Sequence, residues 1–252
     1  MNIIIPLGGK GERFQKEGYI DPKPLIRVLD KEILFYVIDN LNLKEEDNIF
    51  IIYNKYLDEY DFHNIIKTKY SNIHLIKLEN DTKGATETVY IGLTEIIQNK
   101  NNINININIH KKCMLIDGDT FYNESIIDKF RVINENAVFY TKNYDQNPVF
   151  SYLELNELNN IINIKEKVKI SDNANTGVYA FQDINELYKY AKYVLDNNIL
   201  FNNECYTSCI IDTMIKDKIC FKGIELKSES VNVLGTPSQV NEYINCYLKS
   251  KK

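Results

Sequence analysis

The chain has 252 residues, of which 44% are hydrophobic and 26% are charged, and its formal net charge is −5. A chain of this length can bury a large core, and α/β folds of this size often form one domain. The negative charge and the lack of a basic stripe argue against nucleic acid as the main partner.

The sequence also argues against a membrane-spanning or secreted protein and against one held together by disulfides or a zinc finger. No segment approaches the ~18 apolar residues of a membrane span, and no signal-peptide pattern follows Met1, so we expect a cytoplasmic protein. The five cysteines are odd in number and scattered, and Cys205 and Cys209 lack a second pair at zinc-finger spacing. We therefore expect reduced thiols.

Short apolar runs alternate with helical patterns from the start of the chain. Buried strands are predicted at residues 2–6, 48–53, 73–78 and 113–116. Helices, recognised by apolar residues at helical spacing, are predicted between them at 33–40, 60–69 and 86–98. This alternation predicts an α/β fold with a mixed, mainly parallel central sheet between layers of helices. Ligands of such folds bind at the carboxyl ends of the strands.

The second half of the chain mixes strands with longer connections. A strand is predicted at 178–181, and a C-terminal helix carrying Tyr243 and Tyr247 is expected to dock on the domain or on a second subunit. The tract at 99–109 consists almost entirely of Asn and Ile, so we expect residues 101–108 to be an exposed insertion, although their alternation also fits a strand.

The most informative segment follows the first predicted strand and combines three glycines, an arginine and a lysine between two prolines. Its residues are Leu7, Gly8, Gly9, Lys10, Gly11, Glu12, Arg13 and Phe14, followed by Pro22, Lys23 and Pro24. Glycines let backbone N–H groups approach a phosphate or a base closely, and two cations suit a polyphosphate. The segment matches neither a P-loop nor a dinucleotide fingerprint. The alternative is a strand-to-helix turn with surface charges.

An acidic turn, Asp117-Gly118-Asp119, follows the fourth predicted strand. Mg²⁺ is bound in proteins by one or two carboxylates together with phosphate oxygens. The turn is therefore a candidate site for this cation, although Asp and Gly are also ordinary turn residues.

These motifs and several later ones resemble the sugar-phosphate nucleotidyltransferase (NDP-sugar pyrophosphorylase) superfamily over most of the chain. The later motifs are Lys83-Gly84-Ala85-Thr86-Glu87-Thr88, Glu166-Lys167, Asn175-Thr176-Gly177 and Gly235-Thr236-Pro237. The chain is most similar to short single-domain members from capsule pathways and giant viruses, which include N-acetylglucosamine-1-phosphate uridylyltransferases.

The resemblance implies a three-layer nucleotide-binding domain of the nucleotide-diphospho-sugar transferase type. Residues 1–252 would form this single domain, with a nucleotide-binding half at 1–136 and an acceptor-binding half with the C-terminal helix at 137–252.

The resemblance also assigns roles on the nucleotide side. Arg13 and Lys23 would be catalytic, with Arg13 on the β- and γ-phosphates and Lys23 on the α-phosphate. The residues implied to bind the nucleotide are Leu7, Gly8, Gly9, Gly11, Lys83, Gly84 and Ala85. In the alternative interpretation, Gly84 only begins a helix that Thr86 caps.

Asp119 matches the metal-binding aspartate of the family. The family often supplies a second metal carboxylate two residues before the late glycine, and this chain has Val233 there. Asn232, Glu229 or water could take that place.

The remaining motifs point to the acceptor. The residues implied to bind it are Asp117, Gly118, Glu166, Lys167, Asn175, Thr176 and Glu204. Glu166 would accept hydrogen bonds from acceptor hydroxyls and Lys167 would hold the acceptor phosphate, whereas Tyr206 is a weaker candidate next to Glu204. Without the motif order, Glu166-Lys167 would be interpreted as a charged surface turn.

The resemblance implies Mg²⁺-dependent transfer from UTP to N-acetylglucosamine 1-phosphate, with release of pyrophosphate, for nucleotide-sugar and polysaccharide biosynthesis. One alternative is a cytidylyltransferase acting on a phosphorylated alcohol or amide for capsule modification. Another is a non-catalytic regulatory homologue that binds a nucleotide sugar, which Val233 makes conceivable. The expected partners are a nucleoside triphosphate and a sugar 1-phosphate, with neither nucleic acid nor membrane. The sequence leaves open whether the protein forms a homodimer. If the chain is viral, we expect it in the host cytoplasm.

Overall fold

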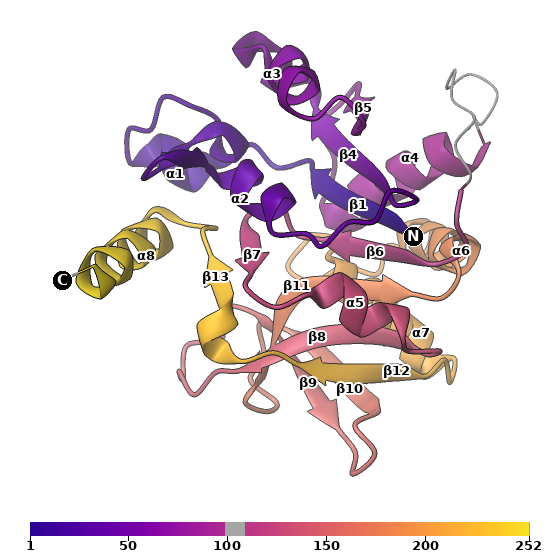
Figure 1. The fold of residues 1–252 in the computed structure, drawn as a ribbon. Helices are drawn as coiled ribbons and strands as arrows, with labels where there is room; N and C mark the ends of the chain where they lie inside the picture. The colour runs from indigo at the N-terminus through magenta and orange to yellow at the C-terminus, as the bar shows by residue number, and fades with distance from the viewer. Residues whose placement is uncertain (99–108, 252) are drawn as a thin grey trace.

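The computed structural model describes residues 1–98 and 109–251 (Figure 1). The predicted insertion at 101–108 lies outside the described residues and stays a prediction. The strands of the central sheet are β1 (Asn2–Leu7), β4 (Asn48–Asn54), β5 (His74–Leu78), β6 (Cys113–Ile116), β8 (Asn136–Lys142), β9 (Ser151–Leu155), β10 (Ile161–Glu166), β11 (Asn173–Phe181) and β12 (Phe221–Glu225). Within the described residues, they form one nine-stranded sheet.

The sheet is mixed, as predicted. The order β10-β9-β11-β6-β1-β4-β5 runs across it, and β8 and β12 continue from β11. Strands β6, β1, β4 and β5 are parallel to one another, whereas β11 is antiparallel to its neighbours β6, β8 and β9. The loops after β1, β5 and β6 therefore leave the same edge of the sheet, because the carboxyl ends of parallel strands coincide.

Helices cover both faces of the sheet and complete the three-layer α/β fold (Figure 1). One layer contains α4 (Ala85–Gln98), α6 (Ile184–Asp196) and α7 (Thr207–Lys216). The other contains α1 (Glu12–Lys16), α2 (Ile33–Asp39), α3 (Phe62–Lys69), α5 (Ile126–Arg131) and α8 (Pro237–Ser250). Alternation along β1 supplies both cores, since Ile3 and Ile5 pack with the α2 side and Ile4 packs with the α4 side.

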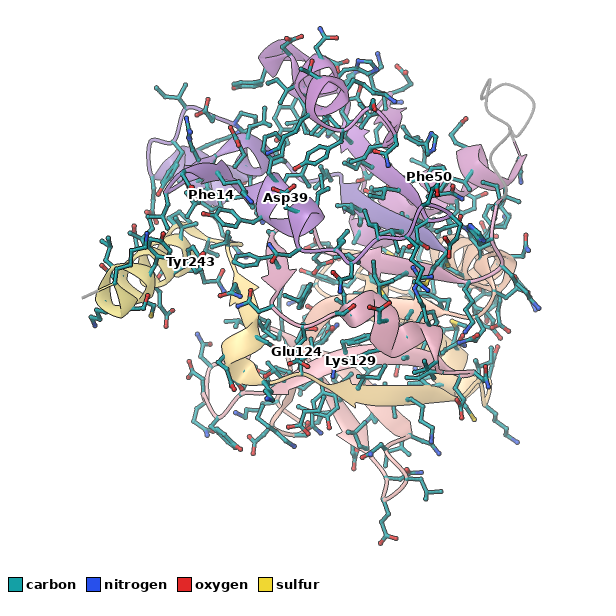
Figure 2. The ribbon with its side chains drawn as sticks, viewed as in Figure 1. Phe14, Asp39, Phe50, Glu124, Lys129 and Tyr243 are labelled. Atoms are coloured by element: carbon teal, nitrogen blue, oxygen red, sulfur yellow. The ribbon has the colours of Figure 1, made fainter. Side chains whose placement is uncertain are left out.

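Two small antiparallel ribbons lie outside the central sheet. They are β2 (Arg27–Val28) with β3 (Lys31–Glu32), and β7 (Thr120–Tyr122) with β13 (Val231–Val233). The β7–β13 ribbon leads the chain into α8, which docks on the domain as predicted. Tyr243, labelled in Figure 2, contacts the rings of Tyr36 and Phe121 edge-on at centroid distances of 5.9 and 5.6 Å.

The structure changes one predicted boundary. The strand expected at 178–181 begins at Asn173, so Asn175, Thr176 and Gly177 lie inside β11. Its pairing with β8 shifts register between Asn175 and Tyr179. A bulge of this kind re-aims side chains and interrupts the two-residue periodicity from which a strand is recognised.

The structure bears on two further features, the state of the cysteines and the character of the helices. All five cysteines are free thiols, of which Cys113, Cys205 and Cys209 are buried. None of the described helices combines the length and the apolarity that a membrane crossing requires.

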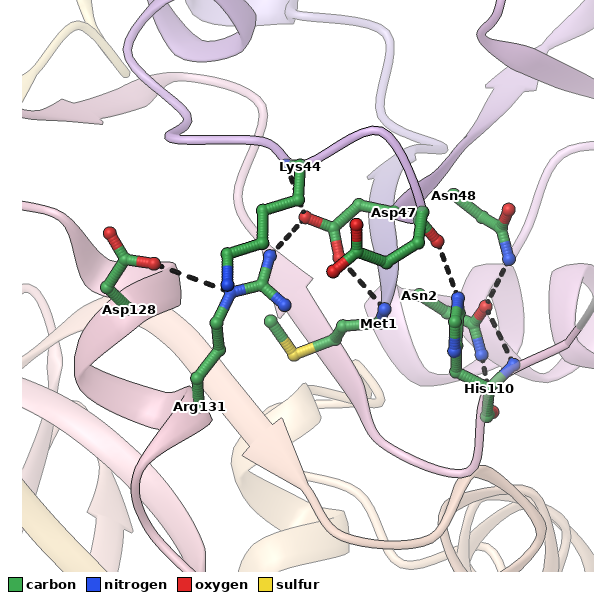
Figure 3. Close-up of polar contacts among 9 residues, drawn as sticks. Met1, Asn2, Lys44, Asp47, Asn48, His110, Asp128 and Arg131 are labelled. Carbon is green, nitrogen blue, oxygen red and sulfur yellow. Dashed lines mark hydrogen bonds and ion pairs between the residues drawn. The ribbon is translucent and has the colours of Figure 1, made fainter.

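A buried ion pair fixes the edge of the sheet opposite to the loops described above (Figure 3). The Asp47 side chain is 0% exposed and pairs with the guanidinium of Arg131, which is 19% exposed. Asp47 also accepts hydrogen bonds from the Met1 amino group at 2.9 Å and from the Lys44 N–H at 2.8 Å. Burial opposes ionisation, but these donors together hold the pKa of the Asp47 carboxyl below its usual value.

We predict that Asp47→Asn lowers the free energy of unfolding by about 3 kcal/mol. The substitution removes the negative charge that compensates the largely buried Arg131 guanidinium. The folded pKa of Asp47 is lowered, so its stabilisation is present above the unfolded pKa and is lost as pH falls through the folded value. The difference between wild type and Asp47→Asn should therefore shrink below about pH 4.

Urea denaturation at several pH values measures this difference. Asp128→Asn is the control, because Asp128 contacts the same Arg131 but is 51% exposed. Equal stability of Asp47→Asn and wild type at pH 7 would show that the pair contributes nothing.

Candidate active site

The Gly-rich loop leaves the carboxyl end of β1 and is anchored by Phe14. The Phe14 ring is buried and contacts Tyr19 edge-on at 5.1 Å, which fixes the short helix α1 that carries the exposed Arg13. Gly11 has a φ of +69°, and a Cβ there would lie 2.9 Å from the Cβ of Lys23. Glycine adopts this backbone conformation without strain and, having no Cβ, permits this close approach. The loop therefore brings the segment that carries Arg13 against the Lys23 turn.

Lys23 begins a short 3-10 helix, Lys23–Leu25, between Pro22 and Pro24. Both prolines are buried, and the Pro22 carbonyl accepts a hydrogen bond from the Leu25 N–H at 2.8 Å. Because proline fixes φ, the turn holds Lys23 rigidly. The Lys23 ammonium forms an ion pair with Asp119, and the two side chains are 25% and 24% exposed. This pair joins the turn after β1 to the loop after β6.

Asp117 and Asp119 lie close enough to influence each other's ionisation. Burial and then the Asp119 charge raise the pKa of the Asp117 carboxyl, against the opposing effect of Lys23. For Asp119, burial acts in the same direction, but the Lys23 ammonium outweighs it and lowers the pKa of this carboxyl. A Cβ at Gly177 would lie 2.5 Å from Asp117 Oδ2, so glycine in β11 leaves room for this carboxyl group.

The donor set at this edge fits a hard cation. Mg²⁺ keeps several waters and binds through one or two carboxylates and substrate phosphates. Asp119 and Asp117 provide such carboxylates, and a divalent cation would relieve the repulsion that raises the pKa of Asp117. The described residues contain no group of three His, Cys, Asp or Glu side chains that could hold a metal unaided. Asp117 and Asp119 would therefore hold such a cation only together with other oxygen ligands.

The position predicted for a second carboxylate lies beside this site. Strand β13 pairs with β7 and sets Val233 opposite Thr120, the residue after Asp119. A Cβ at Gly235 would lie 2.9 Å from Asp119 Oδ2 and 3.2 Å from Gln239 Oε1. Gly235 thus lies between Asp119 and the carboxamide oxygen of Gln239, which accepts a hydrogen bond from the Thr236 hydroxyl at 3.0 Å; the sequence alone did not indicate Gln239.

Gly8 packs against the loop that follows β5. A Cβ at Gly8 would lie 2.2 Å from Thr88 Oγ1 and 2.9 Å from Thr82 Oγ1, whereas a Cβ at Gly9 would meet no atom within 4 Å. Gly8 is thus required for packing, and Gly9 faces open space. Leu7 is buried under the acidic turn, where a Cβ on Gly118 would lie 2.3 Å from its Cδ2.

A buried amide joins the Gly-rich loop to the loop after β5. Asn54, at the end of β4, is 1% exposed and donates hydrogen bonds to the Gly8 carbonyl at 3.2 Å and to Asp81 Oδ1 at 2.9 Å. Asp81 in turn binds the Lys10 ammonium at 2.6 Å. This Asn54 network borders an open cavity of about 510 Å³ on the outer side of the Gly-rich loop. Sequence analysis did not single out Asn54, because one asparagine at a strand end carries no pattern.

Gly84 lies against a loop that is distant in sequence. Its φ is +144°, and a Cβ would lie 2.6 Å from the Cys205 carbonyl oxygen. The Cys205 N–H donates to the Lys83 carbonyl at 3.2 Å, and its carbonyl accepts from the Thr86 N–H at 3.0 Å. The turn at Lys83 and Gly84, predicted to bind nucleotide, is therefore packed directly on the Cys205 segment.

Thr86 does not cap α4, in contrast to the alternative that the sequence left open. The helix begins at Ala85, so Thr86 lies inside it and its hydroxyl donates to the Tyr206 carbonyl at 2.8 Å. The Glu87 carboxylate instead accepts the Lys83 N–H at 2.5 Å. The idea that Thr86 caps the helix is wrong, because its side chain bonds across to another segment.

Glu166 and Lys167 contact the segment that begins α7. Ser208 Oγ donates to Glu166 Oε2 at 2.8 Å, and burial raises the pKa of the Glu166 carboxyl. Lys167 has a φ of +49°, which is rare for a residue with a side chain, and its N–H donates to the Phe150 carbonyl at 2.9 Å. Strain of this kind often marks a functional position.

The Lys167 ammonium is held by Tyr206. Lys167 Nζ donates to the Tyr206 hydroxyl at 2.6 Å and lies 4.5 Å from the centre of its ring. The Tyr206 hydroxyl donates to the Glu204 carboxylate. Tyr206 thus links Glu204 to the Lys167 ammonium.

Asn175 and Thr176 are largely buried and bonded within the protein. Asn175 donates to Ser151 Oγ at 3.0 Å and accepts the Gly177 N–H at 2.9 Å. The Thr176 hydroxyl donates to the Phe139 carbonyl at 3.1 Å. In this structure their side chains hold the bulge of β11.

These groups lie close enough for their charges to influence one another. The ionisation of Asp117 responds to Lys23 on one side and to Glu166 on the other. The ionisation of Tyr206 responds to Glu204, Glu166 and, in the opposite sense, Arg13. The carboxyl edge of the sheet therefore brings together three kinds of group: cations suited to phosphates, carboxylates suited to a metal ion, and Lys167.

Comparisons with known proteins agree with this geometry. The family model described as nucleotidyl transferase matches residues 2–204. The bifunctional protein GlmU of Thermodesulfovibrio yellowstonii is 25% identical over 204 residues, covering 76% of this chain and 41% of that protein. A bifunctional sugar-1-phosphate nucleotidylyltransferase/acetyltransferase of Sulfurisphaera tokodaii is 26% identical over 221 residues, covering 86% and 48%. The chain thus spans less than half the length of these curated relatives.

Solved structures show the same fold. A nucleoside-diphosphate-sugar pyrophosphorylase from Vibrio cholerae RC9 superposes with a TM-score of 0.82 at 18% identity, covering 96% of this chain and 99% of that one. A UDP-glucose pyrophosphorylase complexed with UDP-glucose gives 0.72 at 16% identity, covering 99% and 98%. The CTP:phosphocholine cytidylyltransferase from Streptococcus pneumoniae gives 0.70 at 17% identity, covering 98% of both chains. With four-fifths of its length matched by the family model, this chain belongs to the nucleotidyl transferase family.

Proposed function

We propose that this protein transfers the nucleotidyl group of a nucleoside triphosphate to the phosphate of a sugar 1-phosphate. An acceptor phosphate oxygen attacks the α-phosphorus, the bond to the β-phosphate breaks, and pyrophosphate leaves. The observation that carries the proposal is the Lys23–Asp119 pair, because the neighbouring Asp117 carboxyl responds to both of these charges and to Glu166.

Each charged group has a task in this reaction. Lys23 stabilises the charge that develops on the α-phosphate, Arg13 holds the β- and γ-phosphates, and Lys167 holds the incoming phosphate. A sugar phosphate is already an anionic nucleophile, so the residues act by orientation and charge neutralisation. Bound Mg²⁺, held by Asp119 together with Asp117 and phosphate oxygens, would supply further charge neutralisation.

The backbone loops would bind the nucleotide. Gly9 faces open space and would let the nucleotide approach the backbone closely, while Gly8 and Gly11 keep the loop packed on its neighbours above Leu7. Lys83, Gly84 and Ala85 would bind the base from the other side. Asp117, Gly118, Asn175 and Thr176 would shape the acceptor end. In this proposal residues 1–136 bind the nucleotide and residues 137–252 the acceptor.

UTP and N-acetylglucosamine 1-phosphate are the substrates that we propose. The match to a sugar-1-phosphate nucleotidylyltransferase/acetyltransferase supports a sugar 1-phosphate as the acceptor. The superposition with a UDP-glucose pyrophosphorylase supports only the fold that such an enzyme uses.

A substrate matrix tests the proposal. Pyrophosphate release is measured with UTP, CTP or dTTP in combination with N-acetylglucosamine 1-phosphate, glucose 1-phosphate or phosphocholine, with and without Mg²⁺. We expect the highest kcat/KM with UTP and N-acetylglucosamine 1-phosphate. Preference for CTP with phosphocholine would support the cytidylyltransferase alternative. No Mg²⁺-dependent release with any pair would contradict the proposal and favour a non-catalytic homologue.

Lys23→Ala should lower kcat by about 10²-fold or more, because it removes a cation that acts on the transition state. The fold should persist, since the side chain is a loop residue that is partly exposed. Steady-state kinetics and thermal unfolding measure both effects. Lys16→Ala is the matched control, because Lys16 lies in the neighbouring helix α1 and is 77% exposed. A Lys23→Ala enzyme with nearly normal kcat would rule out this role.

Substitution of Asp119 and of Asp117 should reduce the activity to different extents. Asp119→Asn should reduce Mg²⁺-dependent activity by roughly 10²-fold or more, since it removes the carboxylate that stays ionised beside Lys23. Asp117→Asn should cost about ten-fold or less, because its raised pKa makes it the weaker anionic ligand. Titration of activity with Mg²⁺ provides the comparison. Equal losses would mean that both carboxylates bind the cation equally.

Asn54→Ala should raise the KM for the nucleotide about ten-fold with a smaller effect on the KM for the acceptor, because Asn54 fixes the Gly8 loop. Asn64→Ala is a suitable control, since Asn64 makes only an exposed local bond to Asp61. If both variants leave the nucleotide KM unchanged, the Asn54 network does not position the loop.

A further inference from the structure

The position of Lys167 is set by residues far away in the sequence. Its backbone adopts a φ of +49°, and its side chain reaches the Tyr206 hydroxyl at 2.6 Å. A lysine side chain has many rotamers, so a single donor–acceptor bond with a ring contact restricts it strongly. The ammonium also lies 4.5 Å from the centre of the Tyr206 ring.

Tyr206 is itself held from two sides. Its hydroxyl donates to Glu204, which orients the oxygen that accepts from Lys167. Its carbonyl accepts from the Thr86 hydroxyl at 2.8 Å. Thr86 is 0% exposed and lies in the first turn of α4, directly after the turn at Gly84 that we assign to the nucleotide.

The preceding residue strengthens this connection. Cys205 exchanges two backbone hydrogen bonds with the nucleotide loop, from its N–H to the Lys83 carbonyl at 3.2 Å and to its carbonyl from the Thr86 N–H at 3.0 Å. The segment from Glu204 to Tyr206 therefore touches the nucleotide loop through its backbone and Lys167 through its side chain.

We propose that Tyr206 is a positioning residue that holds the Lys167 ammonium for the acceptor phosphate, and that Thr86 fixes Tyr206 from the nucleotide loop. This inference rests on the proposed function, in which Lys167 binds the acceptor phosphate. Thr86 lies in the first turn of α4, next to the loop proposed to bind the nucleotide, yet its hydroxyl acts on the acceptor side.

The test uses two conservative variants of the full chain. Tyr206→Phe keeps the ring but removes the hydroxyl that accepts from Lys167, and Thr86→Val keeps the shape but removes the donor to Tyr206. We expect Tyr206→Phe to raise the KM for N-acetylglucosamine 1-phosphate about ten-fold, because hydrogen bonds to charged groups are worth more than neutral ones. Thr86→Val should raise it about three-fold by the same argument, and the KM for UTP should stay within about two-fold in both variants.

Two control variants remove the same type of bond elsewhere. Tyr190→Phe removes a tyrosine hydroxyl bonded to Asp217 at 2.8 Å, and Thr94→Val removes a hydroxyl bonded to Tyr90 within α4 at 2.8 Å. Neither control should change the acceptor KM. A rise in the controls equal to that in the test variants would show a general loss of packing and overturn the inference.

Direct binding separates this inference from the proposed function. Calorimetry of N-acetylglucosamine 1-phosphate binding needs no turnover, and Tyr206→Phe should weaken it about ten-fold. If wild type releases no pyrophosphate but binds this ligand in a Tyr206-dependent way, the proposed function fails and the positioning role holds. If Tyr206→Phe binds and turns over the acceptor as wild type does while Lys167→Ala does not, the positioning role is wrong. If Lys167→Ala also behaves as wild type, Lys167 does not hold the acceptor phosphate and the inference fails with it.

Discussion

Negative charge gathered at the carboxyl edge of the sheet is the constraint on which the site depends. Asp117 and Asp119 lie in the turn after β6, Glu166 ends β10, and the Asp117 carboxyl is within electrostatic reach of the other two. Carboxylates that repel one another in a poorly hydrated crevice are costly unless cations compensate them. Lys23 compensates Asp119 directly, and Lys167 lowers the cost of ionising Glu166.

The two lysines at this edge are also restrained by their surroundings. Pro22 and Pro24 restrict the Lys23 turn, while Tyr206 and an unusual backbone conformation restrict Lys167. Cations that are held in place before substrate arrives need little reorganisation when a triphosphate and an acceptor phosphate bind. These restraints on Lys23 and Lys167 would therefore favour the proposed chemistry.

The sequence predicted the local features and missed the distant contacts. Apolar runs located β6 to the residue, and glycine and proline marked the loops around Gly8 and Lys23, because these signals lie within a few neighbouring residues. The bonds of Tyr206 to Lys167 and Thr86 join residues 39 and 120 positions apart and leave no periodicity in the sequence. The roles of Asp119 and Lys167 came from family resemblance, and the structure adds which side chains hold them.

The central claim is that this edge of the sheet transfers a nucleotidyl group. The most direct measurement follows phosphorus label from UTP in the presence of N-acetylglucosamine 1-phosphate and Mg²⁺. The account predicts that label on the α-phosphate enters the nucleotide sugar and that label on the γ-phosphate leaves only in pyrophosphate. Label from the γ-phosphate on the sugar, or no label transfer from the α-phosphate of any nucleoside triphosphate, would contradict it.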